Sequence, residues 1–496
     1  MRKLKVLLVV CFAFTVASTV RAQGGSNAEL KGDYAFTFNG MTTGGGGAST
    51  VFAAVGRFTA DGAGNLINGE LDSNGAAPQE KLVAQTFNGT YTIGADHRGV
   101  MNLNIPGGGK LAFAMMANGN AKFVEVDAAG GTGTVGSGTM EKADTTAFNT
   151  AKIMGSYAFG VAGLDAWNSR SAIAGHLTAN GAGLFTDGAA DVNQSGRFTT
   201  LASYAAQYTV SDTTNGRGTI VLPPLLGGVP QNLNLVFYMV NAAKLFAMEI
   251  DPVTIATPLL NGVVLQQQSP IGGFSNASLN GGVVMSLTGL ALCGSGGTPA
   301  SNVIVGLLTG NGSGGLTLTY DQNCGGTPTS VTGLSGTYSM ASNGRVGITL
   351  GSNYMAAYLV SPNQAFFIVP DSSVLFGFGD PQAAGPFTNG AVKGRYASSA
   401  TTPATLGVVI FSGEFTADGV SPTGNITGVE DIGAPRGATF GVAASATYSI
   451  LSTTTNGRGN ITGGIGGNGI LYVVSPSKFA VVSLSDANPA VLVFEQ

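Results

Sequence analysis

The sequence has 496 residues, of which 78 are glycine, and its formal net charge is −4. A hydrophobic content of 44% excludes a disordered chain, and the lack of a three-residue glycine period excludes collagen. The slight net negative charge argues against a basic patch for nucleic acid. Two histidines and three cysteines are too few for most metal sites and histidine-dependent active sites. We therefore expect no catalytic site, no metal site and no cofactor.

The N-terminus has the pattern of a secretion signal. Basic residues in the first five positions precede the apolar run 4–16, and VRA at 20–22 fits a signal-peptidase site. We expect a signal peptide over 1–22 and cleavage after Ala22. The apolar run is too short to favour a stable membrane span. The expected location is extracellular or at the cell surface, with the periplasm as an alternative.

A strand, a tight turn and a second strand recur four times. The first strands are GTYTI (89–93), QYTV (207–210), GTYSM (336–340) and ATYSI (446–450). Three of the turns contain Asn-Gly, which supplies the positive φ that a hairpin needs. We assign structural turn roles to Gly99, Gly216, Gly344 and Gly457. The turn arginines Arg98, Arg217, Arg345 and Arg458 are roughly 110–130 residues apart, which is the size of a small domain.

Polar or Gly/Pro-containing linkers support the same division. The sequence predicts four domains after the signal peptide, at 28–142, 151–267, 272–380 and 387–496. A second hairpin recurs within them, as in FTADGAGNL (58–66) and LTANGAGLF (177–185). We expect a monomeric array of these domains.

Eight strands are predicted in the first domain, and no segment has a helical period. Their ranges are 33–40, 51–60, 64–72, 82–93, 99–105, 110–117, 121–126 and 136–142. Eight strands in nearest-neighbour order can close on themselves and remove both sheet edges. The fold class is therefore all-β, with four tandem up-and-down antiparallel barrels. β-Sandwiches are the alternative.

These motifs resemble lipocalin-like and avidin-like barrels, and secreted Gly-rich bacterial β-repeat proteins with GxY, FTADGxGN and GxYTxxxxGRG patterns. The Gly-x-Trp motif of lipocalins is missing, because the only tryptophan, Trp167, is not in an opening strand. The resemblance implies a ligand mouth at the end carrying the longer connections, which follow the odd-numbered strands.

Several polar residues are candidate sites. Trp167, in a long connection of the second domain, could contact a ligand, although packing on the barrel rim is the favoured interpretation. One aspartate recurs near the end of strand three in each domain, and we expect it at the open end. These residues are Asp72, Asp191, Asp321 and Asp431. Ligand contact is a hypothesis for them, whereas solvation at the rim or bracing of loops is favoured over catalysis.

Another set of polar residues occupies the second recurrent hairpin. Asp61, Asn180, Asn311 and Asp418 faintly suggest calcium loops, but an Asx-stabilised turn is the favoured interpretation. We expect weak surface pairs between Arg98 and Asp61 and between Arg458 and Asp418. His97 and His176 belong to different domains, so no shared metal site is expected.

Cys293 and Cys324 lie in the third domain, and secretion favours a disulfide between them. Strands one and three of a meander run in the same direction but are about 10 Å apart, so we expect both cysteines in connecting loops.

The leading functional interpretation is a non-enzymatic binding, adhesion or structural role toward an unknown extracellular ligand or surface. Carriage of small apolar ligands inside lipocalin-like barrels and an outer-membrane β-barrel are the alternatives. A cavity above roughly 300 Å³ inside one domain would favour ligand carriage.

Overall fold

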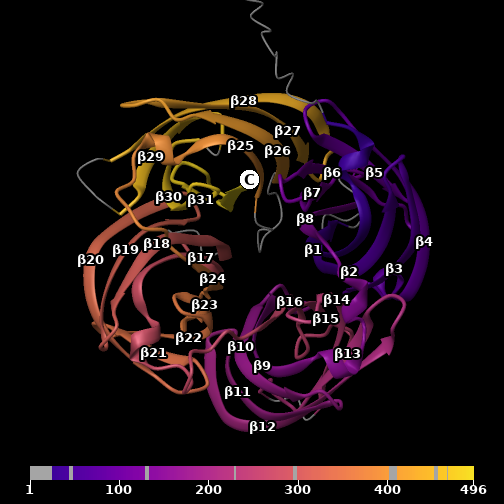
Figure 1. Ribbon diagram of the computed structural model, residues 1–496, viewed down its shortest axis with the longest axis horizontal. Coiled ribbons are helices and arrows are strands. Elements are labelled where there is room, and N and C mark those ends of the chain that lie inside the picture. The colour runs from indigo at the N-terminus through magenta and orange to yellow at the C-terminus, as the bar shows by residue number, and fades with distance from the viewer. Residues whose placement is uncertain are drawn as a thin grey trace, which may run out of the picture.

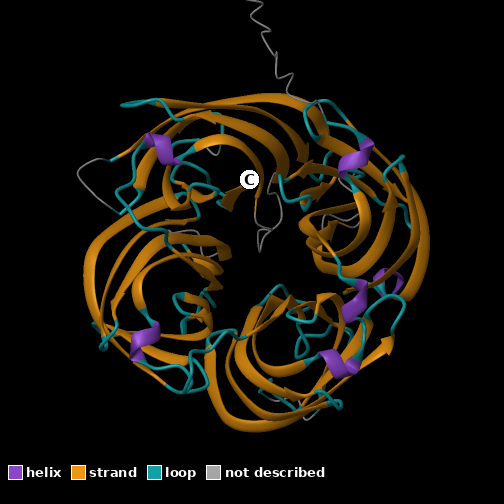
Figure 2. Cartoon of the chain, viewed as in Figure 1, coloured by secondary structure: helices purple, strands orange, loops and turns teal. Residues whose placement is uncertain are grey.

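The structure is a computed structural model that describes residues 25–43, 49–128, 133–227, 231–293, 299–400, 410–451, 456–465 and 467–496. The predicted signal peptide, 1–22, lies outside these residues. The chain forms four closed, eight-stranded antiparallel barrels in tandem, with no α-helix in the described part (Figure 2). The predicted fold class is confirmed, and the sandwich alternative is wrong. No helix of the described ranges has the length and hydropathy needed to span a bilayer.

In every barrel each strand pairs with its neighbours in the chain, and the first strand pairs with the eighth. Barrel 1 contains β1 (Lys31–Thr43), β2 (Ser49–Asp61), β3 (Asn65–Gly75), β4 (Leu82–Ile93), β5 (Arg98–Leu103), β6 (Lys110–Met115), β7 (Ala121–Glu125) and β8 (Gly133–Lys142). Barrel 2 contains β9 (Met154–Leu164), β10 (Arg170–Asn180), β11 (Leu184–Gln194), β12 (Arg197–Asp212), β13 (Arg217–Leu222), β14 (Leu233–Asn241), β15 (Lys244–Glu249) and β16 (Leu259–Gln266).

The second half of the chain repeats this order. Barrel 3 contains β17 (Asn280–Leu292), β18 (Pro299–Asn311), β19 (Gly315–Cys324), β20 (Thr327–Met340), β21 (Arg345–Leu350), β22 (Asn353–Ser361), β23 (Gln364–Ile368) and β24 (Phe376–Pro381). Barrel 4 contains β25 (Lys393–Ala400), β26 (Ile410–Asp418), β27 (Gly424–Gly433), β28 (Thr439–Ile450), β29 (Arg458–Gly463), β30 (Gly469–Ser475), β31 (Lys478–Ser483) and β32 (Val491–Glu495).

The recurrent tyrosine of strand four closes one end of each barrel. Its hydroxyl donates to a backbone carbonyl just after a short 3₁₀ helix that precedes strand one. The helices are η1 (Asn27–Glu29), η4 (Thr150–Lys152), η5 (Asn276–Ser278) and η7 (Asn389–Ala391). The bonds are Tyr91 to Leu30 (2.6 Å), Tyr208 to Ile153 (2.6 Å), Tyr338 to Leu279 (2.8 Å) and Tyr448 to Val392 (2.6 Å). A buried phenol needs such a partner, so this end is packed shut.

The Asx-turn interpretation of the second hairpin is confirmed. One side-chain oxygen of Asp61 accepts from the backbone N–H of Ala63 and of Asn65, and Asn180, Asn311 and Asp418 accept in the same way. These oxygens therefore stabilise the turns.

Three of the four assigned turn glycines have the left-handed backbone expected of them. The φ angles are 66° at Gly216, 88° at Gly344 and 73° at Gly457. The assignment of Gly99 is wrong, because it lies within β5 and the left-handed position of barrel 1 is His97, with φ 64°. Gly99 is instead required by packing, since a Cβ there would lie 2.3 Å from the Phe113 ring.

The four barrels form a closed ring (Figure 1). The outer wall of strands one and two of each barrel packs on strands six and seven of the next, and barrel 4 packs on barrel 1 in the same way. Apolar clusters that span two barrels fill the interfaces. One contains Val55 and Tyr238, and the others contain Ala174 and Tyr358, Val305 and Tyr472, and Val124 and Ile410. The array is thus a ring of barrels that share buried walls.

Candidate functional site

The recurrent arginines and aspartates meet at the interfaces between barrels. Arg217 of barrel 2 binds Asp72 of barrel 1 through two parallel hydrogen bonds, from Nε (2.7 Å) and from Nη2 (2.8 Å). The hydroxyl of Tyr238 in β14 donates to the same carboxylate at 2.9 Å. Two-point contact with a guanidinium is the strong, geometrically specific form of a carboxylate ion pair.

The next two interfaces repeat this arrangement of arginine, aspartate and tyrosine. Asp191 of barrel 2 is bound by Arg345 at 2.7 and 2.8 Å and by the Tyr358 hydroxyl at 3.0 Å. Asp321 of barrel 3 is bound by Arg458 at 2.8 and 2.7 Å and by the Tyr472 hydroxyl at 2.6 Å. Tyrosine and arginine always come from the later barrel, and aspartate comes from the earlier one.

An asparagine two positions after the aspartate adds a second contact. The side-chain amide of Asn193 donates to the carbonyls of Val369 (2.7 Å) and Asp371 (2.8 Å) in the next barrel. Asn74 and Asn323 make the corresponding bonds in their own interfaces. The sequence Asp-x-Asn on strand three is thus an interface motif.

The closing interface, between barrel 4 and barrel 1, differs on both sides. Arg98 binds Asp431 through one nitrogen, Nη1, at 2.6 Å. Ala114 stands where the other barrels have the tyrosine, because it pairs with Arg98 as Tyr238 pairs with Arg217. Gly433 stands where they have asparagine, and a Cβ there would lie 2.4 Å from the carbonyl oxygen of Glu125.

These contacts correct the predicted roles of the four aspartates. Asp72, Asp191 and Asp321 are 0% exposed and Asp431 is 4% exposed, so none of them is a solvated rim residue or is free for a ligand. The expected pairs Arg98–Asp61 and Arg458–Asp418 are also wrong, since both arginines bind a neighbouring barrel.

The charge state of Asp321 follows from its surroundings. Burial acts to raise its pKa, but hydrogen bonds from Arg458, Ser330 and Tyr472 outweigh burial and hold the pKa below the usual value. The group is therefore an ionised structural carboxylate, whereas a general acid or base at neutral pH needs a raised pKa.

The remaining predicted residues are separate from one another. Trp167 is 75% exposed in the connection between β9 and β10, so the expectation that it packs on the rim is wrong, and its role in ligand contact stays a prediction. Nδ1 of His97 lies 2.9 Å from a carboxylate oxygen of Glu29, and Nδ1 of His176 lies 2.8 Å from Oε1 of Gln267. No group of metal-ligating side chains occurs in the described ranges.

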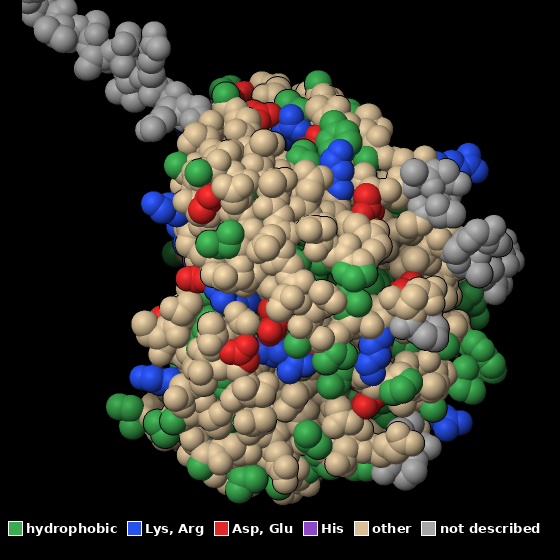
Figure 3. Space-filling model, turned by 90° about the vertical axis from the view of Figure 1, so that its right-hand side faces the viewer, with side chains coloured by type: hydrophobic (Ala, Val, Ile, Leu, Met, Phe, Trp, Pro, Cys, Tyr) green, Lys and Arg blue, Asp and Glu red, His purple; other side chains and the backbone are tan. Residues whose placement is uncertain are grey.

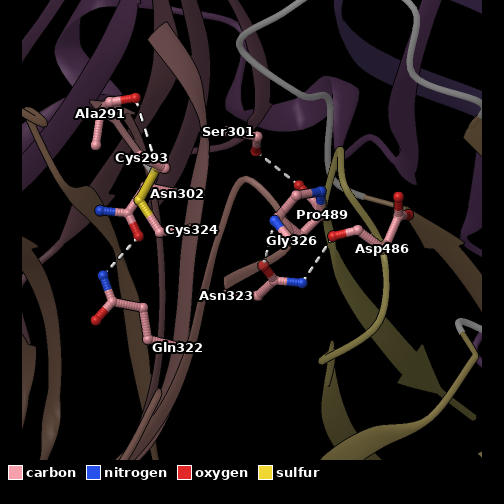
Figure 4. Close-up of a disulfide and its surroundings, with 10 residues drawn as sticks. All are labelled: Ala291, Cys293, Ser301, Asn302, Gln322, Asn323, Cys324, Gly326, Asp486 and Pro489. Atoms are coloured by element: carbon pink, nitrogen blue, oxygen red, sulfur yellow. Dashed lines mark hydrogen bonds between the residues drawn. A yellow bond between two sulfur atoms is a disulfide. The ribbon is translucent and has the colours of Figure 1, made fainter. Parts of the chain in front are cut away.

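Cys293 and Cys324 form a disulfide with a Cα separation of 5.5 Å (Figure 4). Cys293 follows β17, as expected for a loop position, but Cys324 is the last residue of β19. Beside it, Asn323 donates to the carbonyl of Asp486, and Ser301 donates to that of Pro489 (Figure 4). The disulfide therefore lies next to the interface between barrels 3 and 4.

Barrel 1 contains a cavity of about 670 Å³. Its deep part is lined by Phe36, Phe38, Phe52 and Phe123, together with Leu71 and Leu111. Residues of the connections after β3, β5 and β7 border its other end. Sequence reasoning identified that end as the possible mouth but did not identify these lining residues.

The connection after strand five differs between barrel 1 and barrels 2 and 4. In barrel 2 the connection after strand five places Leu225 and Leu226 in the core, and in barrel 4 it places Ile465 there. The corresponding segment of barrel 1 is Ile105-Pro106 followed by three glycines, 107–109, which offer no side chains to fill the barrel. The interior is packed near Phe58 and Tyr34, whose ring centroids are 5.6 Å apart. It is hollow toward the end that carries the connections after β3, β5 and β7.

Four charged side chains border this cavity: Glu80, Lys110, Glu125 and Asp127. Burial raises the pKa of Glu125 well above its usual value, and repulsion from Asp127 raises it further. The Nζ of Lys110 lies 4.9 Å from the centroid of the Phe440 ring of barrel 4. The cavity is thus apolar in its depth, where the phenylalanines lie, and has charged groups at one end.

A second cavity, of about 480 Å³, lies at the centre of the ring and is lined by all four barrels. Lys478 on its wall is neutralised by Asp380 (2.9 Å) and Glu495 (2.6 Å). Arg170 on the same wall donates to the carbonyls of Val374 and Thr288 in barrel 3. Glu495 lies in the same barrel as Lys478, whereas the bonds to Asp380, Val374 and Thr288 connect neighbouring barrels. These charged groups of the wall are therefore already paired.

No protein-family model and no curated protein matches the chain significantly. Among solved structures, a protein of unknown function from the DUF3598 family of Nostoc punctiforme PCC 73102 is 9% identical, with a TM-score of 0.15, covering 60% of this chain and 97% of that one. A mutant of the vaccine antigen transferrin binding protein B from Haemophilus parasuis Hp5 is 10% identical, with a TM-score of 0.19, covering 96% of both chains.

Proposed function

We propose that this protein is a secreted or cell-surface binding protein that holds a small, largely apolar molecule inside barrel 1. The observation that carries the proposal is the aromatic-lined cavity of about 670 Å³. Small-molecule sites span roughly 300–1,000 Å³ and combine apolar walls with a few polar groups, and this cavity has both properties. The carrier interpretation is therefore preferred to a purely structural one.

We also propose that the role is non-enzymatic. The aspartates that recur in all four barrels are bound to arginine, and these ion pairs support a structural task for them. The outward residues of β20 beside the inward Tyr338, such as Ser335, Thr337 and Ser339, are polar and exposed. An outer-membrane barrel needs an outward apolar band, so polar outer strands favour an aqueous setting. The face of the ring shown in Figure 3 carries hydrophobic groups scattered among polar ones.

The proposal is tested by titrating the full mature chain with a neutral lipophilic dye, Nile red, and following its fluorescence. We expect saturable binding. Ala54 lines the cavity, so Ala54→Phe should abolish binding by filling it. Thr86→Phe, which adds the same ring on the exposed outer wall of barrel 1, should bind the dye like the wild type. Absence of dye binding to the wild-type chain would overturn the proposal.

Adhesion is a second candidate, favoured by the exposed indole of Trp167. The backbone N–H of Ala166, its neighbour, donates to the carbonyl of Thr254, the residue before the exposed Ile255. An exposed aromatic on a loop is a common contact for glycans and proteins. Binding of the wild type to a glycan array, and its loss in Trp167→Ala, is the expected result. Equal binding by both forms would exclude this site.

A further inference from the structure

We infer that the ligand of barrel 1 is an amphipathic cation, with an apolar body and a protonated amine at one end. This inference rests on the proposed function and adds the chemical class of the ligand. The apolar body would lie among Phe36, Phe38 and Phe123, and the amine would lie beside Glu125 and Asp127.

The first argument is the charge around the cavity. Three of the four charged residues that border it are acidic, Glu80, Glu125 and Asp127, and Lys110 is the fourth. Within the described ranges no ion pair joins Lys110 to these acids, and its ammonium group instead lies over Phe440. The backbone N–H of Lys110 donates to Asp127 at 3.2 Å. The cavity therefore has more acidic than basic groups around it, which favours a cation over a carboxylate.

The second argument is where the acids are placed. Residues alternate across β7, so Phe123 and Glu125 face the interior while Val124 packs on barrel 4. Glu125 follows Phe123 toward the end bordered by Asp127, at the boundary between the aromatic depth and the polar rim. The aromatic faces add attraction for a cation, because their π-systems are negative above the ring. A neutral ligand would gain nothing from either feature.

Protonation provides a signature of this binding mode. Burial and Asp127 raise the pKa of Glu125 well above its usual value, so the free carboxyl binds a proton more readily than a solvated glutamate does. An ammonium group beside it would favour the carboxylate, and the proton would pass from Glu125 to solvent. Amine binding should therefore release a proton, whereas binding of an alcohol with the same chain should release none.

The test compares decylamine, decanol and decanoate as competitors of Nile red on the full mature chain at pH 7. We expect decylamine to displace the dye at a concentration at least tenfold below that of decanol, with decanoate the weakest. Glu125→Gln should bring decylamine within about twofold of decanol while dye binding persists. Asp187→Asn, at an exposed acid of barrel 2, should keep the wild-type preference.

Calorimetry in two buffers of different ionisation enthalpy gives an independent readout. We expect release of a proton on decylamine binding to the wild type, and none in Glu125→Gln. If Nile red binds but the three competitors act alike, or decanoate is strongest, the inference about the amine is wrong while the proposed function stands. If decylamine releases no proton, Glu125 does not hold the amine. If the dye fails to bind, the proposed function itself fails.

Discussion

Arg98 of barrel 1 and Asp431 of barrel 4 form an ion pair of 2.6 Å across 333 positions of sequence. The Asp431 side chain is almost fully buried, so this contact belongs to an interior interface. It joins the first barrel to the last and closes the ring. Each barrel consequently has two neighbours, and no barrel has a free interface wall.

Removing the charge of an interface aspartate should destabilise the ring. Asp191→Asn leaves the guanidinium of Arg345 without its carboxylate, and breaking a buried ion pair costs roughly 3 kcal/mol. Thermal unfolding of the mature chain measures the effect. Asp61→Asn makes the same chemical change in an exposed Asx turn where barrels 2 and 3 already use asparagine, and it should lower the melting temperature much less, because it loses only an exposed bond from Asn65. Equal shifts in the two variants would contradict the interface role.

The closing interface should weaken as pH rises. Burial raises the pKa of Glu414 to about 8 against the opposing effect of Arg395, and burial next to Asp431 raises the pKa of Glu430 to about 7. Groups whose folded pKa is raised contribute stability that is full below the unfolded pKa and is lost as pH rises through the folded value. The expected window is therefore about pH 4.5 to 8.

Hydrogen exchange of β26 amides, corrected for intrinsic rates, measures this dependence. Protection should fall between pH 5 and pH 8 relative to β10, which lies at the interface of barrels 2 and 3. Glu414→Gln should flatten the profile. Protection of β26 that increases with pH would show that the raised pKa values do not control this interface.

The left-handed turn at Gly457 should not tolerate a β-branched residue. Its φ is 73°, and a Cβ there would also lie 3.2 Å from that of Val473, so Gly457→Val should cost roughly 1–3 kcal/mol. Gly457→Asn should cost less, because asparagine adopts this conformation more readily and barrel 1 has His97 there. Denaturant unfolding ranks the variants. An unchanged stability of Gly457→Val would contradict the strained turn.

The fourth barrel alone, residues 387–496, tests modularity. Its core contains the aromatic set Tyr396, Phe415, Phe479 and Phe494, so we expect cooperative unfolding and dispersed amide signals. Without its neighbours, Tyr472 and Val482 would be exposed, so we also expect self-association by light scattering. Val482→Lys should restore a monomer. A fragment without cooperative unfolding would show that the ring is the folding unit.

The disulfide between Cys293 and Cys324 should be present in protein from its native source. Closing a loop of 31 residues adds roughly 3 kcal/mol, so reduction should lower the melting temperature. Intact mass after alkylation, with and without reductant, counts the free thiols. Two thiols alkylated without reductant would exclude the bond.

The strand pattern could be predicted because each barrel closes through local pairing. All eight predicted strands of barrel 1 end within three residues of the observed ones. Alternating residues such as Tyr34, Phe36 and Phe38 define the inner face, and the turns set the register. Gly99 was misassigned because His97 holds the left-handed position before the turn arginine, where the other three barrels have glycine.

The ring could not be predicted from periodicity, because the contacts join residues more than a hundred positions apart. Arg345 and Asp191 both recur, but the sequence does not say that the barrel walls face each other. The repeated Asp-x-Asn of strand three and the tyrosine of strand six were available signals, since a solvated rim does not require a buried phenol such as Tyr358. The cavity depends on the three glycines at 107–109, which place no side chain in the core. The alternation of hydrophobic residues along the strands gives no information about such a connection.

Gly433 makes the interface between the last and the first barrel different from the other three interfaces. Barrel 3 carries Asn323 at the corresponding position, where it bonds the next barrel, whereas a Cβ at position 433 would lie 2.4 Å from the Glu125 carbonyl oxygen of barrel 1. Barrel 1 also offers Ala114 and no hydroxyl to the carboxylate it receives. Barrel 4 therefore meets barrel 1 through a surface that lacks both the asparagine and the tyrosine contacts of the other three interfaces.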